Sequence, residues 1–164
     1  MVDEGFFEDE RIELLEGVIV EMTPRGARQA VTLQRLTARL DAALGPRADL
    51  RVELPFAASE TSEPEPYLAV VPPDDYELSH PAQALLVIEI AESPLNIDRR
   101  VKAEIYAIAG VPEFWLVDLA QGVIEVRTEP AGDGYGQLQL VRSGERISLC
   151  ALPDVEIAVS DIVC

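Results

Sequence analysis

The sequence is poor in the residues that build metal clusters and disulfide frameworks. Its 164 residues include 2 cysteines, Cys150 and Cys164, and 1 histidine, His80. The cysteines form no CxxC pair and have no histidine near them, so nothing suggests a zinc cluster. We expect Cys150, in an apolar run, to be a small buried side chain and Cys164 to be a free thiol. His80 lies in a polar loop flanked by proline, where we expect a solvated residue.

Long apolar runs are also absent. No window approaches the length that spans a bilayer, and the acidic segment 1–10 lacks the basic and apolar parts of a signal peptide. The sequence contains no Walker loop, dinucleotide-binding glycine pattern or Ser-His-Asp order. These absences predict a cytoplasmic protein without a membrane partner.

Positive charge is scarce and unevenly placed. The formal net charge of -17 argues against strong non-specific DNA binding, which depends on neutralising phosphates with Lys and Arg. Even so, arginines are concentrated between residues 25 and 51, and Arg28, Arg35 and Arg39 form a stripe along a predicted helix. This stripe has two interpretations, contact with nucleic-acid phosphates or pairing with the acidic amino-terminal hairpin, and we favour the second.

Periodicity and turn residues predict one α/β domain over residues 1–164, with an acidic tail at 1–9. The expected elements are a hairpin at 11–22, a helix at 27–44, strands at 51–58, 67–71 and 84–91, a helix at 97–109 that Asn96 caps, a strand at 113–119, a hairpin of 123–127 with 137–142, and short strands near 147 and 155. The second helix should turn Ile97, Val101, Ile105 and Ile108 inward. The strand–helix–strand unit from 84 to 119 favours a parallel pair within a mixed sheet.

Two charged residues stand out from this pattern. Glu89 is the only charge in the apolar strand 85–91, where a carboxylate costs several kcal/mol unless it is paired, protonated or metal-bound. Lys102 is the only lysine in the chain. Each also has a plain structural interpretation: Glu89 could pair with an arginine at the end of its strand, and Lys102 could form an exposed pair with Asp98.

A long block of sequence decides between these interpretations. It consists of IEIAESP at 88–94, Asp98, Lys102 and Tyr106 on the following helix, and AGVPEFWLVD at 109–118. The block resembles the Uma-two family of endonucleases, within the restriction-endonuclease-like PD-(D/E)xK superfamily. ELLEGVIVEM at 13–22 is similar to the opening hairpin of the family, and EPEPYLAVV at 63–71 is similar to its "P-D" strand. The resemblance covers about residues 10–130.

The resemblance implies a restriction-endonuclease-like mixed β-sheet core flanked by helices, with extra β-hairpins at both ends of the chain. It also implies cleavage of DNA phosphodiesters with Mg²⁺ or Mn²⁺, which suit oxygen ligands and can activate water. Glu89 matches the metal-binding strand glutamate, Lys102 matches the lysine that assists the attacking water, and Glu13 matches an early glutamate that joins the site. We further expect a symmetric homodimer.

The sequence departs from the family pattern at two positions. Tyr67 stands where the family has its metal-binding aspartate, and a phenol that is protonated at neutral pH is a poor Mg²⁺ ligand. Glu65, two residues earlier, is a candidate replacement ligand. Gln29 stands where a histidine is common. We therefore expect weak metal binding and weak or absent cleavage; the alternative is a non-catalytic, acidic protein-interaction module on the same fold.

Overall fold

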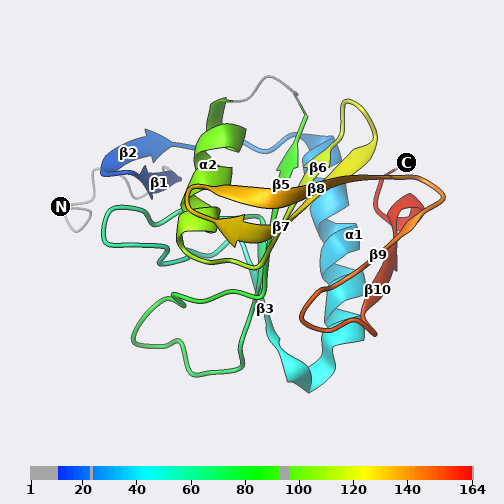
Figure 1. Ribbon diagram of the computed structural model, residues 1–164, viewed down its shortest axis with the longest axis horizontal. Coiled ribbons are helices and arrows are strands. Elements are labelled where there is room, and N and C mark those ends of the chain that lie inside the picture. The colour runs from blue at the N-terminus through cyan, green and yellow to red at the C-terminus, as the bar shows by residue number, and fades with distance from the viewer. Residues whose placement is uncertain (1–10, 23, 93–96, 164) are drawn as a thin grey trace.

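The computed structural model describes residues 11–22, 24–92 and 97–163. A mixed sheet separates two helices that cover its opposite faces (Figure 1). The elements are β1 (Ile12–Leu15), β2 (Val18–Glu21), α1 (Ala27–Leu44), the 3-10 turn Gly45–Arg47, β3 (Asp49–Val52), β4 (Leu68–Val71), β5 (Leu86–Ala91), α2 (Ile97–Ile108), β6 (Glu113–Asp118), β7 (Val123–Ala131), β8 (Gly134–Arg142), β9 (Arg146–Ser148), β10 (Glu156–Ala158) and the 3-10 turn Val159–Asp161.

The central sheet has the 6-stranded order β3-β4-β5-β6-β7-β8. β5 and β6 are parallel, with Glu89 opposite Leu116, and every other neighbouring pair is antiparallel. The parallel pair exists because α2 carries the chain across the sheet between the two strands. The predicted mixed sheet, with Glu89 on an inner strand between two helices, is therefore confirmed.

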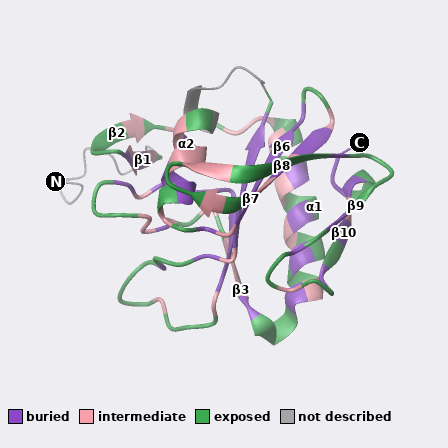
Figure 2. Cartoon of the chain, in the orientation of Figure 1, coloured by how far each residue is buried: buried purple, intermediate pink, exposed green. Residues whose placement is uncertain are grey.

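Alternation along β5 places Glu89 beneath α2. All six residues of β5 are buried, because helices cover both faces of the sheet (Figure 2). Ile88 and Ile90 pack in the core on the α1 side, whereas Val87 and Ala91 pack in the core on the α2 side. Since successive strand residues face opposite sides, Glu89 shares the α2 side with Val87 and Ala91.

The bounds of α1 agree with the sequence prediction. Leu36, Leu40 and Leu44 are fully or almost fully buried against the sheet, as the leucine stripe predicts. At the amino-terminal end, the Gln29 side chain accepts a hydrogen bond from the Gly26 N–H at 2.8 Å. Its amide nitrogen also donates to the Ile90 carbonyl at 3.3 Å, which links the start of α1 to β5.

The inner face of α2 differs from the prediction. Ile108 is 62% exposed, while Lys102, Ile105 and Tyr106 are buried. The helix is rotated because its polar contacts with β1 and β5 place Lys102 and Tyr106, one turn apart, toward the sheet. The predicted cap Asn96 and the side chains of Ile97 and Asp98 lie outside the described residues.

Several predicted segments need correction. The strand at 51–58 is instead β3, because Glu53 takes a left-handed backbone conformation (φ 53°) and Pro55 follows. The β7–β8 hairpin is longer than predicted, and its turn is confined to Gly132 and Asp133. β9 and β10 form a separate 2-stranded sheet. Cys150 is exposed rather than buried, because Leu149 takes the inward position after β9.

Two further sequence predictions concern the ends and the surface of the chain. The acidic tail 1–9 and Cys164 lie outside the described residues. His80 is exposed, as predicted, and lies 3.3 Å from an Arg51 nitrogen. Within the described part of the chain, no helix combines the length and apolar character that crossing a membrane requires.

Candidate active site

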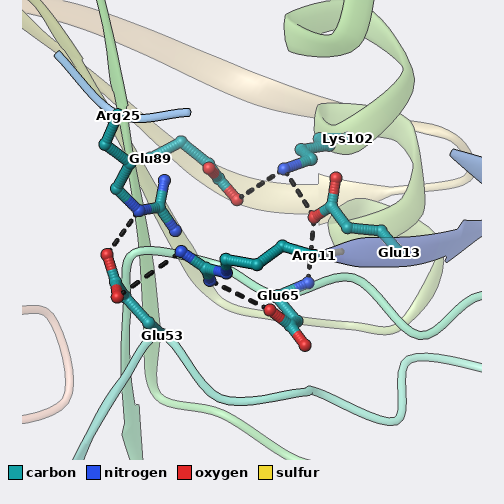
Figure 3. A network of polar contacts seen from close by, with 7 residues as sticks. All are labelled: Arg11, Glu13, Arg25, Glu53, Glu65, Glu89 and Lys102. Atoms are coloured by element: carbon teal, nitrogen blue, oxygen red, sulfur yellow. Dashed lines mark hydrogen bonds and ion pairs between the residues drawn. The ribbon is translucent and has the colours of Figure 1, made fainter. Parts of the chain in front are cut away.

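Three elements that are distant in sequence bring Glu13, Glu89 and Lys102 together. Glu13 comes from β1, Glu89 from β5 and Lys102 from α2 (Figure 3). The Lys102 ammonium lies 2.8 Å from Glu13 Oε1 and 3.3 Å from Glu89 Oε1. The exposed Asp98–Lys102 interpretation is therefore wrong: the buried lysine bridges two carboxylates.

Burial sets the electrostatics of this cluster. Glu13, Glu89 and Lys102 are only 5%, 6% and 7% exposed. Burial raises the pKa of Glu89 above its ordinary value, against the opposing effect of Lys102, and the Glu13 charge raises it further. Burial alone would lower the pKa of Lys102, but attraction to Glu89 and Glu13 outweighs it, so that pKa is raised. Lys102 thus stays charged at neutral pH, while Glu89 is more readily protonated than a surface glutamate.

Tyr106 completes the surroundings of the Glu89 carboxylate. Its hydroxyl donates to Glu89 Oε1 at 2.8 Å, so both described contacts of this carboxylate involve the same oxygen. Burial, and then the Glu89 charge, raises the pKa of Tyr106 well above the ordinary value, and the hydroxyl remains a donor. Tyr106 packs on Phe114, with ring centroids 5.2 Å apart, which fixes the hydroxyl beneath α2.

Glu65 does not join the carboxylate pair. Its backbone N–H donates to Glu13 Oε1 at 2.9 Å, which holds Glu13 toward Lys102. Its own carboxylate pairs instead with Arg11 at 3.0 Å. The segment is anchored to β1 through an isolated bridge between Leu14 and Glu63. Glu65 therefore supplies a positioning amide rather than a replacement metal ligand.

Tyr67 lies in the same cluster and has an arginine on its ring. The side chain is 7% exposed, and the Arg25 guanidinium carbon lies 3.5 Å from the ring centroid. Burial raises the pKa of Tyr67, the neighbouring Arg25 lowers it, and the charge of Glu89 raises it again. The net rise leaves a neutral phenol at neutral pH.

Arg25 also lies in this site, although the sequence did not single it out as a candidate site residue. It precedes α1 and forms an ion pair with Glu53, which in turn lies 3.5 Å from Arg11 (Figure 3). The only signal in the sequence was the excess of arginine between residues 25 and 51. That signal drew attention to the helical stripe, whereas Arg25 lies just before the helix.

The residues present do not form a good site for a divalent metal. Mg²⁺ and Mn²⁺ need several oxygen ligands. Among the described residues, no group of three or more His, Cys, Asp or Glu side chains could hold a metal ion. Oε1 of both Glu13 and Glu89 is committed to Lys102, position 67 offers a phenol, and the Arg25 guanidinium stacks on that phenol's ring.

The arginine stripe of α1 faces the carboxy-terminal part of the chain. Arg28 donates to the Leu119 carbonyl at 2.9 Å, Arg35 donates to the Ile162 carbonyl at 3.5 Å, and Arg39 lies 3.9 Å from Asp161. The expected pairing of Arg28 and Arg39 with the amino-terminal hairpin is therefore wrong. The hairpin packs near α2, on the opposite side of the sheet from α1 (Figure 1).

Comparison with known proteins assigns the family. The Uma2 family model, described as "Putative restriction endonuclease", matches residues 4–160. The chain belongs to the Uma2 family. A similar solved structure is described as "a putative nuclease belonging to DUF820" from Anabaena variabilis, with a TM-score of 0.73, 15% identity, and coverage of 92% of this chain and 88% of that chain. No curated protein matches.

The family and the structural likeness confirm the resemblance inferred from the sequence. The structural likeness shows the restriction-endonuclease-like fold. The description of the family supports a nuclease. In this Uma2 chain, the sequence block around Glu89 and Lys102 coincides with the buried cluster beneath α2.

Proposed function

We propose that this Uma2 chain is an endonuclease domain for DNA phosphodiesters, with its site at Glu89, Lys102 and Glu13 and with weak turnover in the wild type. The main support is the burial of Lys102 between two carboxylates supplied by other elements. Well-packed apolar residues would stabilise the fold at least as well as a buried ion triad does. A catalytic role therefore explains the triad better than a stabilising role.

The two principal residues would have different roles. Lys102, whose pKa is raised, stays protonated and would attract a phosphate oxygen or orient a water as a donor. Glu89, whose pKa is raised by burial, is suited to accept a proton from that water. Glu13 would hold Lys102 in place. With a carboxylate at position 67, as the family resemblance implies, a bound Mg²⁺ or Mn²⁺ would add Lewis-acid chemistry.

DNA is the proposed partner, and its binding would be weak. The net charge of -17 opposes phosphate binding over most of the surface. Arg28, Arg35 and Arg39 remain our candidates for phosphate contacts, and the side chain of Arg39 is 58% exposed. These donors, which now contact the Leu119 carbonyl and the carboxy-terminal segment, would have to be shared with DNA.

The proposal is tested by Mn²⁺ calorimetry and plasmid nicking on a set of variants. We expect weak metal binding and little nicking from the wild type, and a gain in both from Tyr67→Asp, because a carboxylate adds charge and a ligand. Adding Glu89→Gln or Lys102→Ala should abolish that gain. Nicking that survives both changes would place the chemistry elsewhere in the molecule.

A second candidate function is supported by the Arg25–Tyr67 pair, which stands where a metal ligand is expected. In that case the chain is a non-catalytic interaction module that keeps the fold and uses its acidic surface. The same assays separate the two candidates. A variant that binds Mn²⁺ through Glu89 yet never nicks DNA would favour the interaction module.

We also propose a symmetric homodimer. β8 is an edge strand of the central sheet, and its Leu138 and Leu140 are 53% and 45% exposed. Pairing of two such edges would satisfy the free backbone groups of β8 and bring these leucines beside those of the second copy. Light scattering should give twice the monomer mass of 17.9 kDa, and Leu138→Lys with Leu140→Lys should shift the distribution to monomer. A monomer at high concentration would contradict the proposal.

A further inference from the structure

Arg25 is embedded in the candidate site and only partly satisfied by it. Its side chain is 12% exposed, and its guanidinium lies on the face of Tyr67. Nε and Nη2 are buried, and neither has a hydrogen-bond acceptor with good geometry among the described residues, although Nε is close to Glu53. Such a costly placement indicates that the positive charge itself is needed there.

The carboxylates of this network outnumber its cations, which explains why a positive charge is required at Arg25. The network in Figure 3 contains the carboxylates Glu13, Glu53, Glu65 and Glu89, and its cations are Arg11, Arg25 and Lys102. With every group ionised, the network has one excess negative charge, and the loss of Arg25 would make the excess two. Glu13 and Glu89 are almost fully buried, and unbalanced negative charge beside them is unfavourable, so the charge of Arg25 lowers the electrostatic cost of the cluster.

The partners of Arg25 are arranged around this cation. A guanidinium is attracted to the electron-rich face of an aromatic ring, and Tyr67 presents such a face at 3.5 Å. Glu53, which pairs with Arg25, has a left-handed backbone (φ 53°), a conformation that is uncommon outside glycine. The Glu53 N–H donates to the Tyr67 carbonyl at 3.0 Å, so the two partners of Arg25 are tied to each other.

We propose that Arg25 is an internal cation that takes the place of the divalent metal beside Glu89, and that Tyr67 is the residue that makes this exchange possible. The inference rests on the proposed function for the identity of the metal-facing carboxylate. Arg25 and Tyr67 act as a unit: the phenol removes a metal ligand and its ring binds the guanidinium.

Mn²⁺ calorimetry on four proteins tests the exchange: the wild type, Arg25→Gln, Tyr67→Asp, and the double variant. In Tyr67→Asp alone, Arg25 would pair with the new carboxylate and limit the gain in metal affinity. The double variant should bind Mn²⁺ at least about tenfold more tightly than Tyr67→Asp, because a competing cation is gone. Adding Glu89→Gln to the double variant should remove this binding.

Thermal unfolding gives a second readout that does not depend on activity. Without metal, Arg25→Gln should lower Tm more than the matched control Arg28→Gln, since Arg28 is an arginine at the start of α1 that bonds a carbonyl outside the cluster. Mn²⁺ should restore Tm in the double variant but not in Arg25→Gln alone. If Arg25→Gln prevents folding, Arg25→Met keeps the apolar packing on Tyr67 and serves in its place.

Two results would overturn the exchange. One is a wild type that binds Mn²⁺ as tightly as the double variant, and the other is a double variant that binds no better than Tyr67→Asp. Either would show that Arg25 does not exclude the metal. Failure of the proposed function is separate from these results, because it would appear as tight, Glu89-dependent Mn²⁺ binding without any nicking of DNA.

Discussion

Replacing Lys102 with methionine should lower the free energy of unfolding by about 3–5 kcal/mol near neutral pH. The lysine bridges Glu13 and Glu89, and all three are almost fully buried. Methionine has a similar length but no charge, so it leaves the Glu13 and Glu89 carboxylates without the cation that bridges them. Urea unfolding followed by circular dichroism measures the loss.

The loss caused by Lys102→Met should shrink on acidification. Burial already raises the pKa of Glu89 in the wild type, and removing Lys102 takes away the group that opposes this rise. A carboxyl group with a raised folded-state pKa favours folding below its unfolded pKa and loses that contribution as pH rises through the folded pKa. The destabilisation should therefore be smaller near about pH 5 than near about pH 7.

The charge of Lys102 in the wild type stabilises the fold through neutral pH, and this contribution is lost only at alkaline pH. Its pKa is raised in the folded state, so its contribution is complete through neutral pH and is lost only above the ordinary lysine pKa. Arg100→Met is the matched control, because Arg100 lies on the same helix but is 87% exposed and pairs with Glu104. An equal loss for Lys102→Met at both pH values would contradict the charge-based explanation.

Trp115→Ala is expected to destabilise the protein by about 3–5 kcal/mol through cavity formation in the core. Trp115 is fully buried on β6 and packs in the core on the α1 side of the sheet. Its indole N–H also donates at 2.8 Å to Glu113, whose other carboxylate oxygen accepts the Cys150 N–H at 2.9 Å. The substitution therefore removes both packing and a donor to a buried carboxylate.

Chemical denaturation followed by circular dichroism tests this prediction, since Trp115 is the protein's only tryptophan and its fluorescence is lost in the variant. Burial raises the pKa of Glu113, and the hydrogen bonds from Cys150 and Trp115 oppose this rise. Trp115→Phe, which keeps an aromatic ring but not the donor, should cost distinctly less than Trp115→Ala. Equal losses would show that the hydrogen bond, and not the cavity, dominates.

The order of elements could be predicted because it depends on local pattern. The leucine stripe and Gly45 define α1, and the continuous apolar run of β5 predicts a strand buried on both faces. The errors arose where tertiary contacts overrode local preference. β3 ends at Val52 because the left-handed Glu53 turns the chain, and Ile108 faces solvent because polar contacts with the sheet orient α2.

The candidate site was predicted in part, and for two different reasons. Glu89 stood out because a charge inside an apolar strand is costly, which is a local argument. Lys102 was ambiguous, since helical spacing placed it equally well beside Asp98, and only the resemblance to the family favoured the site. Glu13 rested wholly on that resemblance, because nothing in its own hairpin distinguishes it from the other acidic residues there.

The sequence by itself determined the fold class, the anomalous charge of Glu89 and the absence of an acidic residue at position 67. These features are local, since periodicity and the cost of a buried charge can be read within one element. Only the tertiary structure decided that Lys102 bridges Glu13 and Glu89 and that Arg25 stacks on Tyr67. Those contacts join separate elements, and no local pattern encodes which distant charge will compensate a buried one.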